Sequence, residues 1–94
     1  MEVKLAARGP NYIELEITGV DFGIISSLQE ILNNYADVEY AGANLTHPLI
    51  GKIRFVLRTK NETSPEDVLT RGLSELSQTA KNLRTVISEL LKLT

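Results

Sequence analysis

The residues that could perform catalysis are few and scattered along this sequence. His47 is the single histidine, and no Asp, Ser or Cys is arranged around it in the sequence. Glu14 and Glu16 lie two residues apart in a stretch that alternates like a β-strand, so their carboxylates share one face of that strand. Paired carboxylates can carry acid–base chemistry, but the opposite face here is apolar, and we interpret the pair as a solvated strand face. His47 is likewise interpreted as a surface or structural histidine, so an enzyme is the weakest hypothesis.

Binding sites for metals, cofactors and nucleic acid are not predicted either. The chain has no cysteine, and one histidine with scattered carboxylates does not form the ligand set that a metal site needs. None of the six glycines belongs to a dinucleotide- or phosphate-binding loop. The net charge is −2 and the ten basic residues are spread over the chain, which argues against a protein that grips nucleic acid by itself. No apolar run approaches membrane-spanning length, and the first residues do not begin a signal peptide, so we expect a cytoplasmic protein.

The strongest pattern in the sequence is a long amphipathic stretch from Ser64 to Leu93. Ser64 is a suitable helix cap, and Pro65 at the first helical position has no N–H group to leave unpaired. Apolar residues then recur at alternating steps of four and three, which places them on one stripe of a helix: Leu69, Leu73, Leu76, Ala80, Leu83, Ile87 and Leu90. A single helix over this range would be about 43 Å long, whereas a compact domain of this size measures about 30–35 Å.

The length of this helix predicts that part of its apolar stripe overhangs the domain and binds another chain. On this view the isolated chain should self-associate, and Leu83→Glu should abolish partner binding while leaving the fold close to wild type. The alternative is that the stripe forms the core of this domain. Gly72, in the middle of the helix, costs about 1 kcal/mol relative to alanine. It marks the close approach of another backbone or is merely tolerated.

Four strands and a shorter helix account for the rest of the chain. Residues 1–7 and 12–18 alternate between apolar and polar side chains around a turn, which predicts a β-hairpin. A helix of about 13 residues should follow the cap Asp21. Strands are expected over residues 37–43 and 52–59, with a loop over 44–51 between them. The order β-β-α-β-β-α predicts one α+β domain over residues 1–94, with a four-stranded, mainly antiparallel sheet in one layer and two helices in the other.

Several stretches of the sequence resemble the Rpb11-like family of RNA polymerase subunits, which includes the archaeal subunit L. The likeness spans nearly the whole chain, includes the strand at 52–57, and is strongest in the loop His47-Pro48-Leu49 and in the helix start at 64–69. The opening residues 1–4 and the strand at 11–16 are also similar. The family usually carries an Asp-His-Thr-Leu-x-Asn pattern at its first helix, whereas this chain has Asp21-Phe22-Gly23-Ile24-Ile25-Ser26. The family is similar in turn to the N-terminal domain of the bacterial polymerase α subunit.

The resemblance implies a non-catalytic assembly subunit. Such a subunit pairs through its helices with the larger, Rpb3-like subunit of the polymerase, which is the D-type subunit in archaea. The heterodimer is the platform on which the large catalytic subunits assemble. The candidate dimer-interface residues are the apolar positions of the two helices: Ile24, Leu28, Ile31, Leu69, Leu73, Leu76, Ala80, Leu83, Ile87 and Leu90. The alternative is a homodimeric α+β module, with a small regulatory ligand as one option. No cofactor and no membrane contact are expected in either case.

Overall fold

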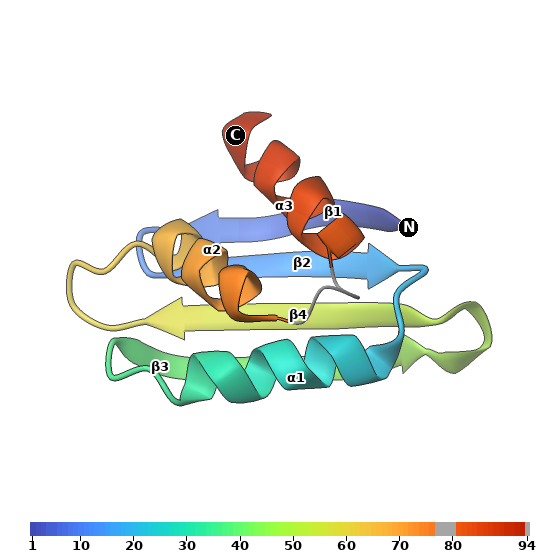
Figure 1. Cartoon of the computed structure of the whole chain (residues 1–94), viewed down its shortest axis with the longest axis horizontal. Coiled ribbons are helices and arrows are strands. Elements are labelled where there is room, and N and C mark those ends of the chain that lie inside the picture. Colours follow the sequence, from blue (N-terminus) through green and yellow to red (C-terminus); the bar gives the residue numbers. More distant parts are fainter. Residues whose placement is uncertain (77–80, 94) are drawn as a thin grey trace.

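A computed structural model describes residues 1–76 and 81–93 of the 94-residue chain. The strands form one antiparallel sheet in the order β1-β2-β4-β3, and the helices lie together on one of its faces (Figure 1). The predicted α+β fold with a four-stranded sheet is therefore confirmed. In chain order the elements are β1 Glu2–Gly9, β2 Tyr12–Thr18, α1 Phe22–Asn33, β3 Val38–His47, the short 3-10 helix η1 Pro48–Ile50, β4 Lys52–Thr59, α2 Pro65–Glu75 and α3 Lys81–Leu93.

Alternation along the two central strands creates the apolar layer of the sheet. Successive side chains of a strand point to opposite faces, so every second residue of β2 and β4 points towards the helices. Leu15 of β2 lies opposite Phe55 of β4, and both side chains are fully buried. The same face contains the other buried side chains of these strands, namely Ile13, Ile17, Ile53 and Leu57. The opposite face is polar and no described helix covers it.

Strand β3 extends further than the sequence suggested. The residues expected to begin a loop continue the strand instead, because Asn44 pairs with Arg54 and Leu45 pairs with Ile53. The connection to β4 is consequently only the short η1 turn, and it closes at Gly51, whose φ of 63° lies in the left-handed region that favours glycine. The predicted loop over residues 44–51 is therefore corrected to a strand end followed by a tight turn.

The predicted single C-terminal helix is wrong. Helix α2 ends at Glu75, and Leu76 has extended backbone with ψ of 155°. The Leu76 N–H donates to the carbonyl of Leu73, and the guanidinium of Arg84 on α3 donates to the Leu76 carbonyl over 3.1 Å. Both backbone groups of Leu76 are thus satisfied where the helix ends, which offsets part of the cost of interrupting the helix. Ala80, one of the predicted stripe residues, lies outside the described residues.

Ending α2 at Glu75 places both parts of the apolar stripe on the sheet. The longest dimension of the protein is 37 Å, shorter than the roughly 43 Å of one straight helix over this range. Helix α2 lies over the central strands, and α3 crosses the β1 side of the sheet (Figure 1). The five stripe residues Leu69, Leu73, Leu76, Leu83 and Ile87 are all buried in the core of this chain. The expected overhang is therefore wrong, and self-association through an overhanging stripe loses its basis.

Helix α2 packs closely against α1 at Gly72. A Cβ atom at this position would lie 2.6 Å from a methyl carbon of Leu32 and 3.3 Å from one of Leu28, so a side chain would displace the core of α1. The adjacent Arg71 donates to Asp37 over 2.8 Å, which ties α2 to the segment just after α1. Of the two alternatives for Gly72, close approach is correct, and the neighbours are side chains of α1 rather than another backbone.

We predict that Leu83→Glu destabilises the isolated chain itself. Leu83 is fully buried, so the substitution loses its apolar burial and places a carboxylate in the apolar core. The free energy of unfolding should fall by at least about 3 kcal/mol in urea denaturation followed by circular dichroism. Asn82→Glu, at the exposed neighbouring position of α3, is the control and should unfold like the wild type. An unchanged transition for Leu83→Glu would contradict the packing of α3 described above.

Candidate functional site

The ten predicted interface residues divide into buried and half-buried positions, apart from Ala80. Leu28, Leu69, Leu73, Leu76, Leu83 and Ile87 belong to the core of the chain and leave almost no surface for a partner. Ile24 and Ile31 on α1 and Leu90 on α3 are half-buried, so they contact the core and still reach the surface. The structure therefore does not bring the ten residues together on one exposed face. The helix side therefore offers two half-buried apolar surfaces. The flank on α1 is formed by Ile24 and Ile31, and the flank on α3 by Leu90.

The flank on α1 follows from its helical spacing. Ile24 and Ile31 are seven residues apart, which places them on one side of the helix. Asn33 lies on the side of α1 turned to the outer edge of the sheet, where its amide bonds to Ala41 of β3. At about 100° per residue, Ile24 and Ile31 point roughly opposite to Asn33, towards the side on which α2 and α3 lie. Two β-branched apolar side chains are thus left half-covered next to the other helices.

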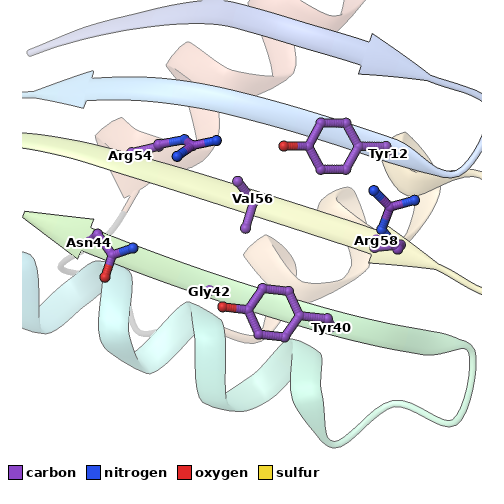
Figure 2. Close-up of a pocket in the computed structure, with 7 residues that line it drawn as sticks. All are labelled: Tyr12, Tyr40, Gly42, Asn44, Arg54, Val56 and Arg58. Atoms are coloured by element: carbon purple, nitrogen blue, oxygen red, sulfur yellow. The ribbon is translucent and has the colours of Figure 1, made fainter. Parts of the chain in front are cut away.

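The uncovered face of the sheet contains a cavity of about 340 Å³. Figure 2 shows its lining side chains, which come from three neighbouring strands. Tyr12 of β2 and Tyr40 of β3 lie on the two sides of β4, which contributes Arg54, Val56 and Arg58. A Cβ atom at Gly42 would collide with the ring of Tyr40, so glycine is needed where this ring crosses the strand.

A network of hydrogen bonds connects β2 and β4 beside this cavity. Arg54 donates to both carboxylate oxygens of Glu14, over 2.9 and 3.0 Å, and the Tyr12 hydroxyl donates to the same carboxylate over 2.5 Å. The guanidinium of Arg58 lies 4.8 Å from the centre of the Tyr12 ring. Glu16, the other carboxylate on this strand face, pairs with Lys52 at 3.4 Å. Glu14 and Glu16 therefore share a face as predicted, and each is held by a cation of β4.

The network fixes the protonation of its members. The hydrogen bonds from Arg54 and Tyr12 lower the pKa of Glu14, and donation to Glu14 raises the pKa of Tyr12. Glu14 is consequently ionised and Tyr12 protonated around neutral pH, and each moves away from the range where a general acid or base exchanges protons. The carboxylate pair is a cross-strand connection rather than an acid–base site.

Three other possibilities concern His47, metal-binding groups of side chains and membrane-spanning helices. His47 is exposed at the end of β3, opposite Lys52. Across residues 1–76 and 81–93, no three His, Asp or Glu side chains are grouped so that they could hold a metal ion. No helix in the same ranges is long and apolar enough to span a membrane.

Comparison with known proteins connects this fold to transcription. Residues 12–86 match the RNA polymerase Rpb3/Rpb11 dimerisation domain. The chain is 32% identical over 82 residues to DNA-directed RNA polymerase subunit Rpo11 of Sulfurisphaera tokodaii, covering 87% of both chains. It is also 32% identical over 83 residues to subunit Rpo11 of Sulfolobus acidocaldarius, covering 88% of this chain and 91% of the relative.

A solved structure has the same fold. The crystal structure of DNA-directed RNA polymerase subunit L from Thermoplasma acidophilum superposes with a TM-score of 0.71, over 97% of this chain and 89% of that chain, at 21% sequence identity. The chain belongs to the RNA polymerase Rpb3/Rpb11 dimerisation domain family. Within that family it is an RNA polymerase subunit of the Rpb11/L type, as the sequence resemblance predicted. A family defined by dimerisation rather than by a reaction agrees with the expectation that the chain is not itself an enzyme.

Sequence reasoning missed the network and cavity on the open face of the sheet. The alternation of β2 and β4 shows that Tyr12, Glu14 and Arg54 all face away from the core. Which of them meet depends on the register of the two strands, which the sequence does not specify. The opposite charges of Glu14 and Arg54 were the one usable signal, because opposed charges stabilise neighbouring strands.

We predict a pH-dependent contribution of Glu14 to stability. Its pKa is lower in the folded chain than the ordinary value of 4.5, so the contribution is complete above that value and is lost as the pH falls through the folded pKa. Glu14→Gln should therefore have a lower urea midpoint than the wild type at pH 7, and the difference should shrink as the pH falls below 4.5 and close once the pH is below the lowered pKa of folded Glu14. Glu30→Gln, on the exposed side of α1, is the control and should differ little at either pH. A gap that persists unchanged into acid would show that the charge of Glu14 is not what stabilises the sheet.

Proposed function

We propose that this chain is an assembly subunit that pairs with the larger, Rpb3-like subunit, known in archaea as the D-type subunit. The heterodimer would form the platform on which the large catalytic subunits of the RNA polymerase assemble for transcription. The observation that carries this proposal is the match of residues 12–86 to a dimerisation domain shared by Rpb3 and Rpb11. That range runs from β2 to residue 86 in α3, so it includes Ile24 and Ile31 of the flank on α1 and ends before Leu90.

The helix side is the surface that suits such pairing. Ile24 and Ile31 on α1 and Leu90 on α3 are half-buried in the chain alone, and a partner that covered them would bury further apolar area. The fully buried stripe residues, such as Leu69 and Leu83, would act indirectly by holding the helices in position. By contrast, the open face of the sheet is occupied by charged pairs, which suit the core of an obligate interface poorly.

The competing hypothesis is a homodimeric module that binds a small ligand. The observation in its favour is the cavity on the open face, where Arg58 contacts the Tyr12 ring and, among the described residues, has no carboxylate within 4.0 Å. A small anion could bind there. Membership of a family named for pairing between two different subunits favours the heterodimer.

We predict that charge on the α1 flank blocks pairing without unfolding the chain. The double variant Ile24→Glu/Ile31→Glu should bind the Rpb3-like subunit of the same organism at least about 100-fold more weakly, because carboxylates would be desolvated in an apolar contact. Isothermal calorimetry or analytical ultracentrifugation measures the affinity, and circular dichroism checks the fold. Glu30→Lys, on the solvent side of the same helix, is the control and should bind normally.

Two results would count against this proposal. If the wild-type chain shows no affinity for the Rpb3-like subunit, the heterodimer itself is wrong. If the double variant pairs as tightly as the wild type while remaining folded, pairing occurs through a surface other than the helical flank.

A further inference from the structure

Strand β3 is an edge of the sheet and pairs only with β4. In an antiparallel sheet, alternate residues of an edge strand direct their N–H and C=O groups away from the sheet. Such outward groups are a template for another strand. What this edge can bind depends on which backbone groups of β3 point outward and on whether a side chain already bonds to them.

Asn33 identifies the outward-facing residues. Its side-chain amide donates to the Ala41 carbonyl over 2.9 Å and accepts from the Ala41 N–H over 2.9 Å, so both backbone groups of Ala41 point away from β4. Because the pattern alternates, Ala43 and Leu45 also face outward, while Gly42 and Asn44 bond to β4. Asn33 thus takes the place of a neighbouring strand at Ala41. Over the described ranges, no side chain does the same for Ala43 or Leu45.

Exposed apolar side chains occur on β3 and on segments next to it in the chain, although Tyr40 lines the cavity on the open face and Ile50 lies beside Glu2 and Thr18 of the first two strands. The exposed large apolar residues are Met1, Phe22, Tyr40, Leu45, Leu49 and Ile50, and all but Met1 lie on β3, on the turn after it or at the start of α1. Leu49 is fully exposed. Leu45 lies on the open edge itself, and an exposed apolar side chain beside outward backbone groups is typical of a binding surface.

Helical geometry brings Phe22 to the same edge. Phe22 and Asn33 are three turns apart on α1, so both are on the side turned to the outside of β3. The eleven residue steps from Phe22 to Asn33 span about 16 Å, which equals about five residues of a strand. Figure 1 shows that α1 and β3 run in opposite directions, so with Asn33 level with Ala41 the helical rise places Phe22 near Leu45 and Thr46 at the end of β3. Phe22 and Leu45 therefore flank the open part of the edge on its helix side.

The charge of the β3–β4 hairpin indicates which side chains a segment added to this edge should carry. Between Val38 and Thr59 the hairpin contains three basic side chains, Lys52, Arg54 and Arg58, and one acidic side chain, Glu39; the basic Lys60 follows it directly. Lys52 and Arg54 pair with glutamates of β2, which leaves Arg58 and Lys60 without a carboxylate among the described residues. A segment that joins this edge would be favoured if it carried acidic residues on the face away from the helices.

We propose that a short extended segment of a partner polypeptide adds to β3 across Ala43–Leu45. Its backbone would bond to Ala43 and Leu45, an apolar side chain would lie beside Phe22 and Leu45, and acidic residues would face the basic hairpin. The inference rests on the proposed function, because two outward residues make too short a contact to hold a partner alone; stable interfaces bury about 1,200–2,000 Å². The segment must belong to a polypeptide that is anchored elsewhere on the same assembly. A polymerase subunit recruited by the heterodimer meets that condition, whereas a second copy held by this edge alone does not.

Hydrogen exchange tests this inference without changing the sequence. We compare amide exchange, resolved by mass spectrometry or NMR, in the isolated chain, in its complex with the Rpb3-like subunit and in the complete polymerase. The amides of Ala43 and Leu45 should exchange quickly in the isolated chain and be protected by about 100-fold or more in the polymerase. The amides of Gly42 and Asn44, bonded to β4, and that of Ala41, held by Asn33, should be slow in all three and serve as internal controls.

A matched pair of substitutions tests the same point chemically. Ala43→Pro removes the outward N–H and leaves the bonds to β4 intact, since proline is tolerated on the outer side of an edge strand. The variant should still bind the Rpb3-like subunit, but its incorporation into polymerase should fall by at least about tenfold. Ala43→Val keeps the N–H and should assemble like the wild type.

The outcomes separate this inference from the proposed function. Polymerase that contains the wild-type chain with Ala43 and Leu45 still exchanging quickly would overturn the edge contact and leave the heterodimer standing. Normal incorporation of a folded Ala43→Pro variant would overturn it as well. A chain that never binds the Rpb3-like subunit would overturn both. If Ala43→Pro fails to fold, the exchange of the wild-type amides decides.

Discussion

The structure depends on covering one apolar face of a four-stranded sheet with very little chain. The two central strands direct Ile13, Leu15 and Phe55, with their neighbours, to that face, and all are fully buried. Helix α1 covers the β3 side, and α2 covers the centre. A straight continuation of α2 would leave the β1 side open. Because α2 ends at Glu75, α3 can cross that side, and its Leu83 and Ile87 complete the core.

The break in the C-terminal helix marks the limit of what periodicity predicts. Leu76 and Leu83 are seven residues apart, so their spacing fits one continuous helix as well as two helices of the same pattern. Most helical stability comes from packing of the apolar face, and this face gains more from the sheet than from a continuous axis. The spacing predicted correctly that stripe residues such as Leu69 and Leu83 lie on helices, and the cap Ser64 predicted where α2 begins. It favoured a partner for part of the stripe over the alternative that the stripe forms the core of this domain, and the structure places both Leu69 and Leu83 in that core.

The positions of the strands were predicted better than the pairing between them. Period-two alternation located β2 and β4, and the cap Asp21 located the start of α1, where it accepts from the Gly23 N–H. The register between strands is a property of the assembled sheet, so the Tyr12–Glu14–Arg54 network was not foreseen. The extension of β3 to His47 was missed for the same reason: polar residues typical of a loop become a strand once β4 pairs with them.

The two edges of the sheet are protected in different ways, and the difference bears on function. β1 has a register shift between Leu5 and Ala7 and carries the charged side chains of Lys4 and Arg8, features that discourage pairing with another strand. β3 also has irregular register at its ends, but between Tyr40 and Leu45 its pairing is regular and it carries no charged side chain. Among the described residues, the protective devices of β3 are these two end irregularities and the amide of Asn33, which stops at Ala41. A chain that functions alone gains nothing from an unprotected apolar edge, since such an edge promotes aggregation. If an assembly partner covers β3, as we propose, that edge has no need of protection, which would account for the difference between the two edges.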